Sequence, residues 1–124
     1  IDLDGFKTAN DLGGHEAGDR LLQDVATRLT EALRHGDMAA RVGGDEFVVL
    51  LPGIASAEDA RRVADKIRAA IDRPFTIDGD ELAVSVSMGL AHYPDDGTDA
   101  TTLARHADTA MYRDKAEGKA RRHA

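Results

Sequence analysis

The segment 41–51 constrains the fold more than any other part of this sequence, because its pattern predicts a β-hairpin. Gly43 and Gly44 supply the backbone freedom that a tight turn requires, and apolar residues flank them on both sides. The run 47–51 is apolar at every position, which is typical of a central strand buried on both faces. We therefore expect a buried strand with two adjacent carboxylates, Asp45 and Glu46, at its N-terminal end.

These two acids favour a cation site. Adjacent carboxylates repel each other unless a cation lies between them. Hard oxygen ligands suit Mg²⁺, which commonly accompanies phosphates in proteins. Asp2 ends the first expected strand, so neighbouring strands could bring it to Asp45 and Glu46. The alternative is a Gly-Gly turn with solvated acids, which is the better explanation for such a motif standing alone.

Length and charge narrow the class of protein. The 124 residues suffice for one compact domain and are too few for two. A formal net charge of −7 disfavours a surface for nucleic-acid polymers, which requires a basic face. The absence of cysteine excludes disulfides and thiolate metal sites.

No apolar run approaches the ~20 residues of a membrane helix, and no signal peptide is visible. We expect a cytoplasmic domain, although its parent protein could be anchored to a membrane.

Hydrophobic periodicity predicts three helices, over 18–34, 56–73 and 99–117. Ser56 and Asp59 form a variant capping box at the start of the second. The residues expected to interrupt or end the helices are Gly13 and Gly14, Gly36, Pro74 and Gly118.

The expected strands are 1–3, the hairpin arms 38–42 and 46–51, and a second hairpin with arms 75–77 and 82–92. The last arm alternates apolar and small residues with a period of two. The order strand, helix, hairpin, helix, hairpin, helix predicts an α+β fold with helices packed on a mainly antiparallel central sheet.

An ordered series of short motifs covers nearly the whole chain. The segments are Asp2-Leu3-Asp4-Gly5-Phe6-Lys7, Asn10-Asp11, Gly14-His15, Gly18-Asp19, Arg41-Val42-Gly43-Gly44-Asp45-Glu46-Phe47, Val86-Ser87-Met88-Gly89, Ala107-Asp108, Ala110-Met111-Tyr112 and Lys115. In this order and spacing, the series resembles the GGDEF family, the diguanylate cyclases of bacterial signalling. The resemblance implies a palm-like nucleotidyl cyclase fold with a ferredoxin-like βαββαβ core.

The resemblance also implies an activity, in which two GTP molecules condense to cyclic di-GMP and two pyrophosphates. Each subunit of a transient homodimer is expected to hold one GTP. Two Mg²⁺ or Mn²⁺ ions per site, ~3.5–4 Å apart, would activate the attacking 3′-hydroxyl and stabilise the phosphate charge. A sensor or receiver domain in the parent protein is the expected regulator.

The resemblance carries over the following site residues. Asp45 and Glu46 are expected to be catalytic, and the metal ligands are Asp2, the Leu3 carbonyl, Asp45 and Glu46. The family assigns the general base to Asp45, but a metal-bound carboxylate is a poor base, so that role stays open. The expected substrate-binding residues are Phe6, Lys7, Asn10, His15, Asp19, Gly43, Gly44, Lys115 and Lys119.

Some of these residues have simpler explanations. Asn10 could cap a turn, and Asp19 favours a helix N-terminus, although both resemble the family's guanine readers. His15 could be structural and Lys7 simply solvated. Lys115 resembles the family's phosphate-contacting lysine.

Arg34 and Asp37 match the family's inhibitory Arg-x-x-Asp motif, which implies feedback binding of cyclic di-GMP. Arginine can bind a phosphate or a guanine edge through two hydrogen bonds. Without that context, such a pair is usually a surface ion pair of little energetic weight.

The sequence also departs from the family. Lys119 replaces the usual arginine, which removes a planar two-pronged donor, and Asp114 replaces a small apolar residue. We expect Asp114 to repel phosphate or to perturb Lys115. We interpret 1–124 as a single GGDEF-type domain that lacks the family's N-terminal strand-helix segment, with its Leu-Thr-Gly-Leu signature, and its final strand. Two other hypotheses are a non-catalytic module that binds GTP or cyclic di-GMP and a structural dimerisation domain that binds no nucleotide.

Overall fold

A computed structural model describes the backbone of residues 1–4, 6–77 and 79–123, and the side chains of 1–3, 16–77 and 79–117. Its main sheet has four strands in the order β2-β3-β1-β6. Every neighbouring pair in this sheet is antiparallel. The strands are β1 (Asp2–Asp4), β2 (Met38–Gly43), β3 (Glu46–Leu50) and β6 (Ser85–Ser87). This is the predicted α+β fold with a ferredoxin-like core.

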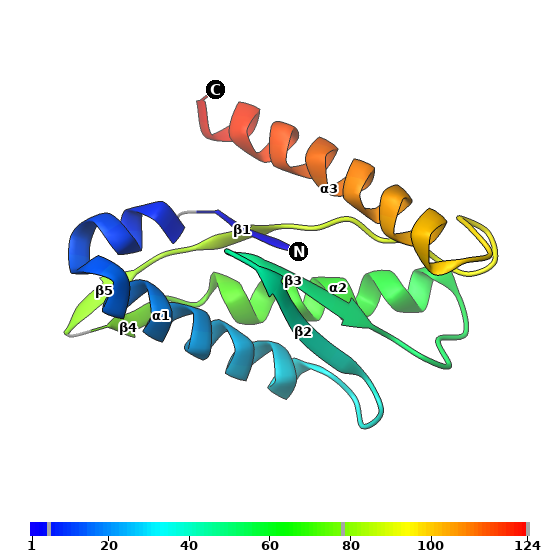
Figure 1. The fold of residues 1–124 in the computed structure, drawn as a ribbon, viewed down its shortest axis with the longest axis horizontal. Coiled ribbons are helices and arrows are strands. Elements are labelled where there is room, and N and C mark those ends of the chain that lie inside the picture. Colours follow the sequence, from blue (N-terminus) through cyan, green and yellow to red (C-terminus); the bar gives the residue numbers. More distant parts are fainter. Residues whose placement is uncertain (5, 78, 124) are drawn as a thin grey trace.

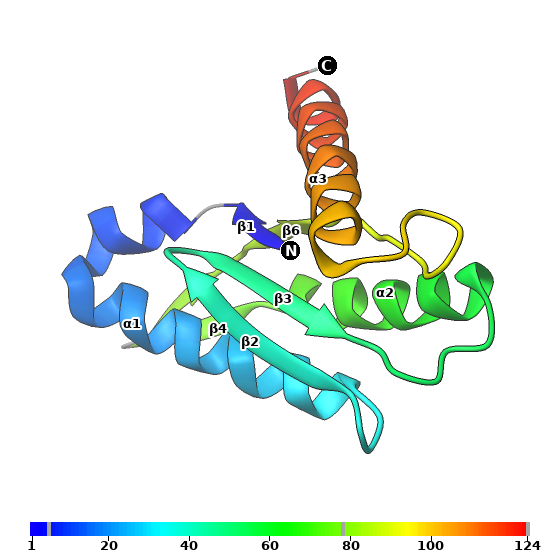
Figure 2. The same cartoon turned by 45° about the vertical axis from the view of Figure 1, so that its right-hand side comes forward.

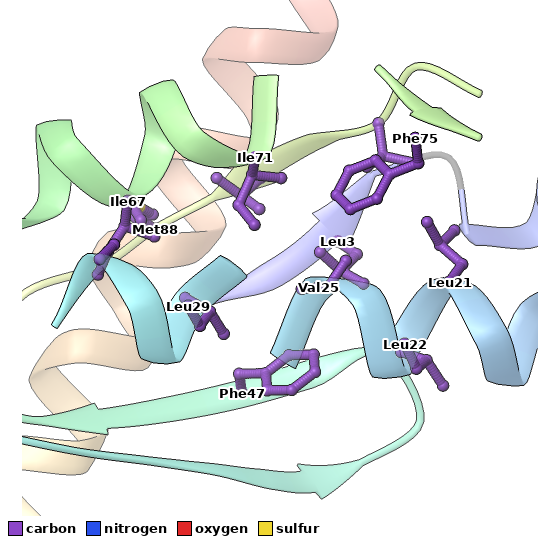
Figure 3. Packing of buried hydrophobic residues seen from close by; sticks show 13 residues of the cluster. Leu3, Leu21, Leu22, Val25, Leu29, Phe47, Ile67, Ile71, Phe75 and Met88 are labelled. Atoms are coloured by element: carbon purple, nitrogen blue, oxygen red, sulfur yellow. The ribbon is translucent and has the colours of Figure 1, made fainter. Parts of the chain in front are cut away.

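Three helices cover the sheet. α1 (Phe6–Ala32) and α2 (Ala57–Asp72) pack against each other on one side, and α3 (Ala100–His123) lies on the other side next to β6 (Figures 1 and 2). The main core lies between the sheet and α1 and α2, and Figure 3 shows side chains from these elements meeting there. Each large apolar side chain buried in this way stabilises the fold by about 1.5–3 kcal/mol. The largest fully buried apolar side chains are Leu3, Leu21, Val25, Leu29, Ile71 and Phe75.

Both ends of α2 have side-chain caps. Ser56 Oγ accepts a hydrogen bond of 3.2 Å from the Asp59 amide, which confirms the predicted N-cap. At the other end, Arg28 of α1 donates at 3.0 Å to the carbonyl of Ala70, which lies in the last turn of α2 and lacks a helical partner, and at 2.8 Å to the carbonyl of Pro74 just beyond the helix. Its guanidinium carbon lies 3.5 Å from the ring centroid of Phe75, the first residue of β4 (Phe75–Ile77), so a cation–π contact also joins α1 to β4.

Two predicted helix boundaries were wrong. α1 runs without a break from Phe6 through Gly13 and Gly14, and α3 continues past Gly118 to His123. A glycine inside a helix costs only about 1 kcal/mol relative to alanine. In α1, the buried stripe that begins at Leu21 outweighs such a cost, so tertiary packing overrides the local signal.

The sequence predicts that β3 is buried on both faces. The strand is central in the sheet, but only one of its faces is buried. Phe47 is 2% exposed, whereas Val48 is 42% and Leu50 58% exposed. The exposed residues lie opposite Ala40 and Met38 of β2. On this face α3 lies over β6 and leaves the hairpin uncovered (Figure 2).

The second predicted hairpin is divided between two sheets. β4 (Phe75–Ile77) pairs with β5 (Asp80–Leu82) as a separate two-stranded sheet. The chain then joins the main sheet as β6, so the predicted strand 82–92 is wrong in its length. Among the residues that the structure describes, β1 offers β6 three partners, the residues Asp2–Asp4. Within the described residues, no helix is both long and apolar enough to cross a membrane.

Gly89 sets how closely α3 approaches the sheet. A Cβ placed on Gly89 would lie 1.8 Å from the Ala107 carbonyl oxygen and 2.5 Å from the Met111 nitrogen. Both are backbone atoms, so no side-chain rotation can relieve the clash.

We predict that Gly89→Ala pushes α3 away from β6 and lowers the free energy of unfolding by about 1–3 kcal/mol. Chemical denaturation would measure this loss. Gly53→Asn is the matched control, because Gly53 has φ +71° and open space around its Cβ position, and asparagine tolerates that conformation. Equal stability of the Gly89→Ala variant and the wild type would contradict the close packing.

Candidate active site

The sheet brings three acids to one place. Asp2 of β1 lies directly opposite Glu46 of β3, and residues directly opposite in an antiparallel pair point to the same face. The Leu3 amide donates to the Asp45 carbonyl oxygen at 3.1 Å, which holds the hairpin tip against β1. Asp2, Asp45 and Glu46 therefore gather at the turn of the hairpin, on the side of the sheet where α3 lies.

The Asp2 carboxylate is mostly buried and only partly paired. Its side chain is 17% exposed, and its Oδ2 accepts a hydrogen bond of 2.7 Å from Lys115 Nζ on α3. Its Oδ1 is buried without a hydrogen-bond partner among the described residues. A buried carboxylate oxygen without a partner is costly, and a cation would satisfy it.

Asp45 is affected by its proximity to Asp2. Burial raises the pKa of the Asp45 carboxyl above its ordinary value, and the neighbouring Asp2 carboxyl raises it further, whereas Lys115 acts in the opposite direction. Two carboxyls that interact in this way bind positive charge readily. Lys115 supplies one such charge.

The donor set fits a hard divalent cation. Among the described residues, no group of three or more His, Cys, Asp or Glu side chains is arranged to hold a metal ion. Mg²⁺ needs no such cage, because it usually binds one or two carboxylates and completes its shell with waters and substrate phosphates. Asp2 and Asp45 can supply these carboxylates, and the unpaired Asp2 Oδ1 gives the clearest ligand.

The glycine turn is open to solvent. Gly43 and Gly44 have φ of +157° and +49°, and nothing lies within 4 Å of a Cβ built on either residue. The positive φ of Gly44 explains the need for glycine there, since other residues rarely adopt it. The free space allows a large ligand to approach the backbone beside the acids.

The structure describes the side chains of only some of the other predicted substrate-binding residues. Asp19 is exposed on α1, and the partly exposed Lys115 forms an ion pair with Asp2. The side chains of Phe6, Lys7, Asn10, His15 and Lys119 lie outside the described residues.

The predicted inhibitory pair is preformed. Arg34 Nε lies 3.2 Å from Asp37 Oδ2, and the Arg34 amide donates to the same oxygen at 2.9 Å. Burial acts to raise the pKa of Asp37, but the hydrogen bonds from Arg34 outweigh it and hold that pKa below its usual value. The pair precedes the six-residue strand β2, so it lies about 20 Å from the glycine turn.

Sequence reasoning missed the partners of two residues on α3. The ion pair of Lys115 with Asp2 joins residues that are 113 positions apart, and no periodicity or spacing indicates it. Asp114 was expected to disturb phosphate or Lys115, but it accepts hydrogen bonds from the Met88 amide and from Arg68.

Comparison with known proteins identifies the family. The family model for the diguanylate cyclase GGDEF domain matches residues 1–121. The chain is 43% identical to the diguanylate cyclase TpbB of Pseudomonas aeruginosa over 123 residues, which is 98% of this chain and 28% of TpbB. It is also 43% identical to the cyclic di-GMP phosphodiesterase PdeR of Escherichia coli over 119 residues, or 96% of this chain and 18% of PdeR. The chain thus spans about a third or less of the curated relatives it matches.

Solved structures agree. The GGDEF domain of TpbB superposes with a TM-score of 0.90 at 44% identity, covering 94% of this chain and 73% of that one. The GGDEF domain of DgcB from Caulobacter crescentus, solved in complex with cyclic di-GMP, superposes with a TM-score of 0.83 at 30% identity, covering 94% and 70%. The acid-bearing hairpin, the sheet order and the family match lead to one conclusion: this chain belongs to the GGDEF family of diguanylate cyclase domains.

Proposed function

We propose that this domain condenses two GTP molecules into cyclic di-GMP and two pyrophosphates, as one half of a homodimer that requires Mg²⁺ or Mn²⁺. One observation carries the proposal above all. Asp2, whose buried Oδ1 has no hydrogen-bond partner among the described residues, lies beside Asp45 at an open glycine turn. Membership of the family supplies the reaction class.

In the proposed reaction, a ribose 3′-oxygen attacks an α-phosphorus and pyrophosphate leaves. Asp2 and Asp45 would hold the divalent ions, with Glu46 and the Leu3 carbonyl nearby. Such ions lower the pKa of the attacking hydroxyl and offset charge on the phosphates. Gly43 and Gly44 leave space for the phosphates to approach the backbone. α1 begins four residues after Asp2, and the N-terminus of a helix can bind an anion through its first backbone amides.

Guanine recognition and dimerisation complete this proposal. Asp19 is exposed on α1, where its carboxylate could accept from the guanine N1–H and amino group, and Asn10 is the second proposed reader. One site holds one GTP, so the attacking hydroxyl must come from a GTP bound to a second copy. We propose that two copies face each other across their glycine turns.

Product feedback is the proposed role of Arg34 and Asp37. Their position at the far end of β2 separates them from the acids, so product could bind there without entering the substrate site. Their preformed geometry lowers the entropic cost of binding a guanine or a phosphate.

A second candidate is a non-catalytic module that binds GTP or cyclic di-GMP. Two observations favour it. One close relative is named as a phosphodiesterase, and Lys119 replaces the family's usual arginine. Calorimetry that detects ligand binding without turnover would select this candidate.

The first test uses the protein that carries this domain. With GTP and Mg²⁺ it should form cyclic di-GMP at a rate per protomer that rises with protein concentration, because two copies build one reaction site. Removal of divalent ions by EDTA should stop the reaction. Chromatography of the products decides the matter, and an absence of cyclic di-GMP at every protein concentration would reject the cyclase assignment.

Asp45→Asn should separate catalysis from stability. We expect cyclic di-GMP formation to fall by about 100-fold or more, because a ligand and candidate base is lost. In metal-free buffer near pH 7 the variant should be more stable than the wild type, by at most about 1 kcal/mol, since the site is partly exposed.

The pH dependence of the stability gain in Asp45→Asn follows from the raised pKa of Asp45. Folding favours protonated Asp45, so the ionised carboxyl destabilises the folded state above the ordinary aspartate pKa. The advantage of Asp45→Asn should therefore disappear as the pH falls below about 3.9, where Asp45 is protonated whether folded or unfolded. Thermal unfolding of both proteins across pH measures this difference in stability. A difference that grows toward low pH would contradict an origin in the charge of Asp45.

Arg34→Ala should relieve product inhibition, because Asp37 alone offers no bidentate donor. Initial rates measured before product accumulates should stay close to those of the wild type. Arg61→Ala, at an exposed arginine of α2, is the matched control. If added cyclic di-GMP inhibits the Arg34→Ala variant as strongly as the wild type, the second site is not at this pair.

A further inference from the structure

Two charged side chains, instead of a further strand, cover the outer edge of β6 in the part of the chain that the structure describes. Arg68 of α2 donates from Nη1 to the Val86 carbonyl oxygen at 2.9 Å. Two residues on, the Met88 amide donates to Asp114 Oδ2 of α3 at 2.8 Å. Arg68 Nη2 lies 3.1 Å from the same carboxylate oxygen. We call this arrangement the Arg68–Asp114 brace.

The brace joins three elements at one place. β6 is the last strand in the order β2-β3-β1-β6, and α2 and α3 lie on opposite sides of the sheet (Figures 1 and 2). Arg68 is 38% and Asp114 23% exposed, so both charges are partly withdrawn from water. Charge-assisted hydrogen bonds in such a setting are stronger and more directional than those of a solvated surface pair.

The residue after Asp114 reaches the acid site. Lys115 Nζ lies 2.7 Å from Asp2 Oδ2, so consecutive residues of α3 bind Met88, which directly follows β6, and Asp2 of β1. With 3.6 residues per turn, neighbouring side chains point about 100° apart, and the two contacts together restrict the rotation of the helix about its axis. The close approach of Gly89 to Ala107 and Met111 sets the distance of α3 from the sheet.

We propose that Arg68 and Asp114 are positioning residues that hold the turn of α3 from which Lys115 reaches Asp2. The catalytic meaning of this inference rests on the proposed cyclase function, whereas its structural part does not. A small apolar residue at position 114 could bind neither the Met88 amide nor Arg68. Asp114 thus gives this chain a way of orienting Lys115 that goes beyond helix packing alone.

The structural part can be tested without nucleotide or metal. An amine-reactive ester labels lysines at a rate that falls when the ammonium group is held in an ion pair. Mass spectrometry would follow Lys115, with Lys66, an exposed lysine of α2, as the internal reference. In Asp114→Ala and Arg68→Met, labelling of Lys115 should become severalfold faster while Lys66 is unchanged.

The matched control is Glu117→Ala, which removes an exposed acid from the same helix and should leave the labelling rate of Lys115 unchanged. Circular dichroism confirms that each variant is folded. If Asp114→Ala does not fold, Asp114→Asn replaces it, because its amide oxygen can still accept from Met88 while the ion pair with Arg68 is lost. Asp114→Asn should give a smaller acceleration, and unchanged labelling of Lys115 in a folded variant would overturn the proposal.

A double-mutant cycle tests the link to the active site, with the affinity for a non-hydrolysable GTP analogue and Mg²⁺ as the readout. If Asp114 acts through Lys115, Asp114→Ala weakens binding in the wild type and has no further effect in a Lys115→Met background. Additive losses would mean that Asp114 acts independently of Lys115 and would overturn its positioning role. A wild type that binds no analogue would reject the proposed function, and the labelling result would then decide the brace by itself.

Discussion

The repulsion between two neighbouring carboxylates, Asp2 and Asp45, is the constraint around which this domain is arranged. The sheet forces them together, because β1 and β3 are hydrogen-bonded neighbours and Asp45 lies in the hairpin turn directly before β3. Burial raises the pKa of Asp45, and the neighbouring Asp2 carboxyl raises it further. Lys115, from the far end of the sequence, supplies one positive charge, and Asp2 Oδ1 leaves a position for a second cation.

The remainder of the fold supports this cluster. The apolar layer under the sheet holds β1 through Leu3 and β3 through Phe47, so the strands that carry the acids cannot shift independently. On the other side, α3 is fixed by the contact at Gly89 and by the Arg68–Asp114 brace. The acid site therefore lies between the packed core and α3, whose distance from the sheet and rotation about its own axis are both restricted.

Local signals predicted those features that depend on near neighbours. The Ser56 cap, the buried stripes of α1 and α2 and the hairpin at Gly43 and Gly44 each follow from a few adjacent residues. The errors arose where a distant partner decides the outcome. Exposure of Val48 depends on what lies over the hairpin, and the length of β6 depends on how many partners β1 offers. Neither quantity is encoded in the segment itself.

The sequence by itself determined the fold class, the family and the identity of the acids, because ordered motifs and hydrophobic periodicity can be recognised from the order of the residues alone. Only the tertiary structure decided which charges meet. It paired Lys115 with Asp2 and turned Asp114, which in sequence terms is an unexplained departure, into the acceptor for Met88 and Arg68. The physical reason is that an ion pair depends on distance in space, and only the tertiary fold brings Lys115 to Asp2 across a sequence separation of 113 positions.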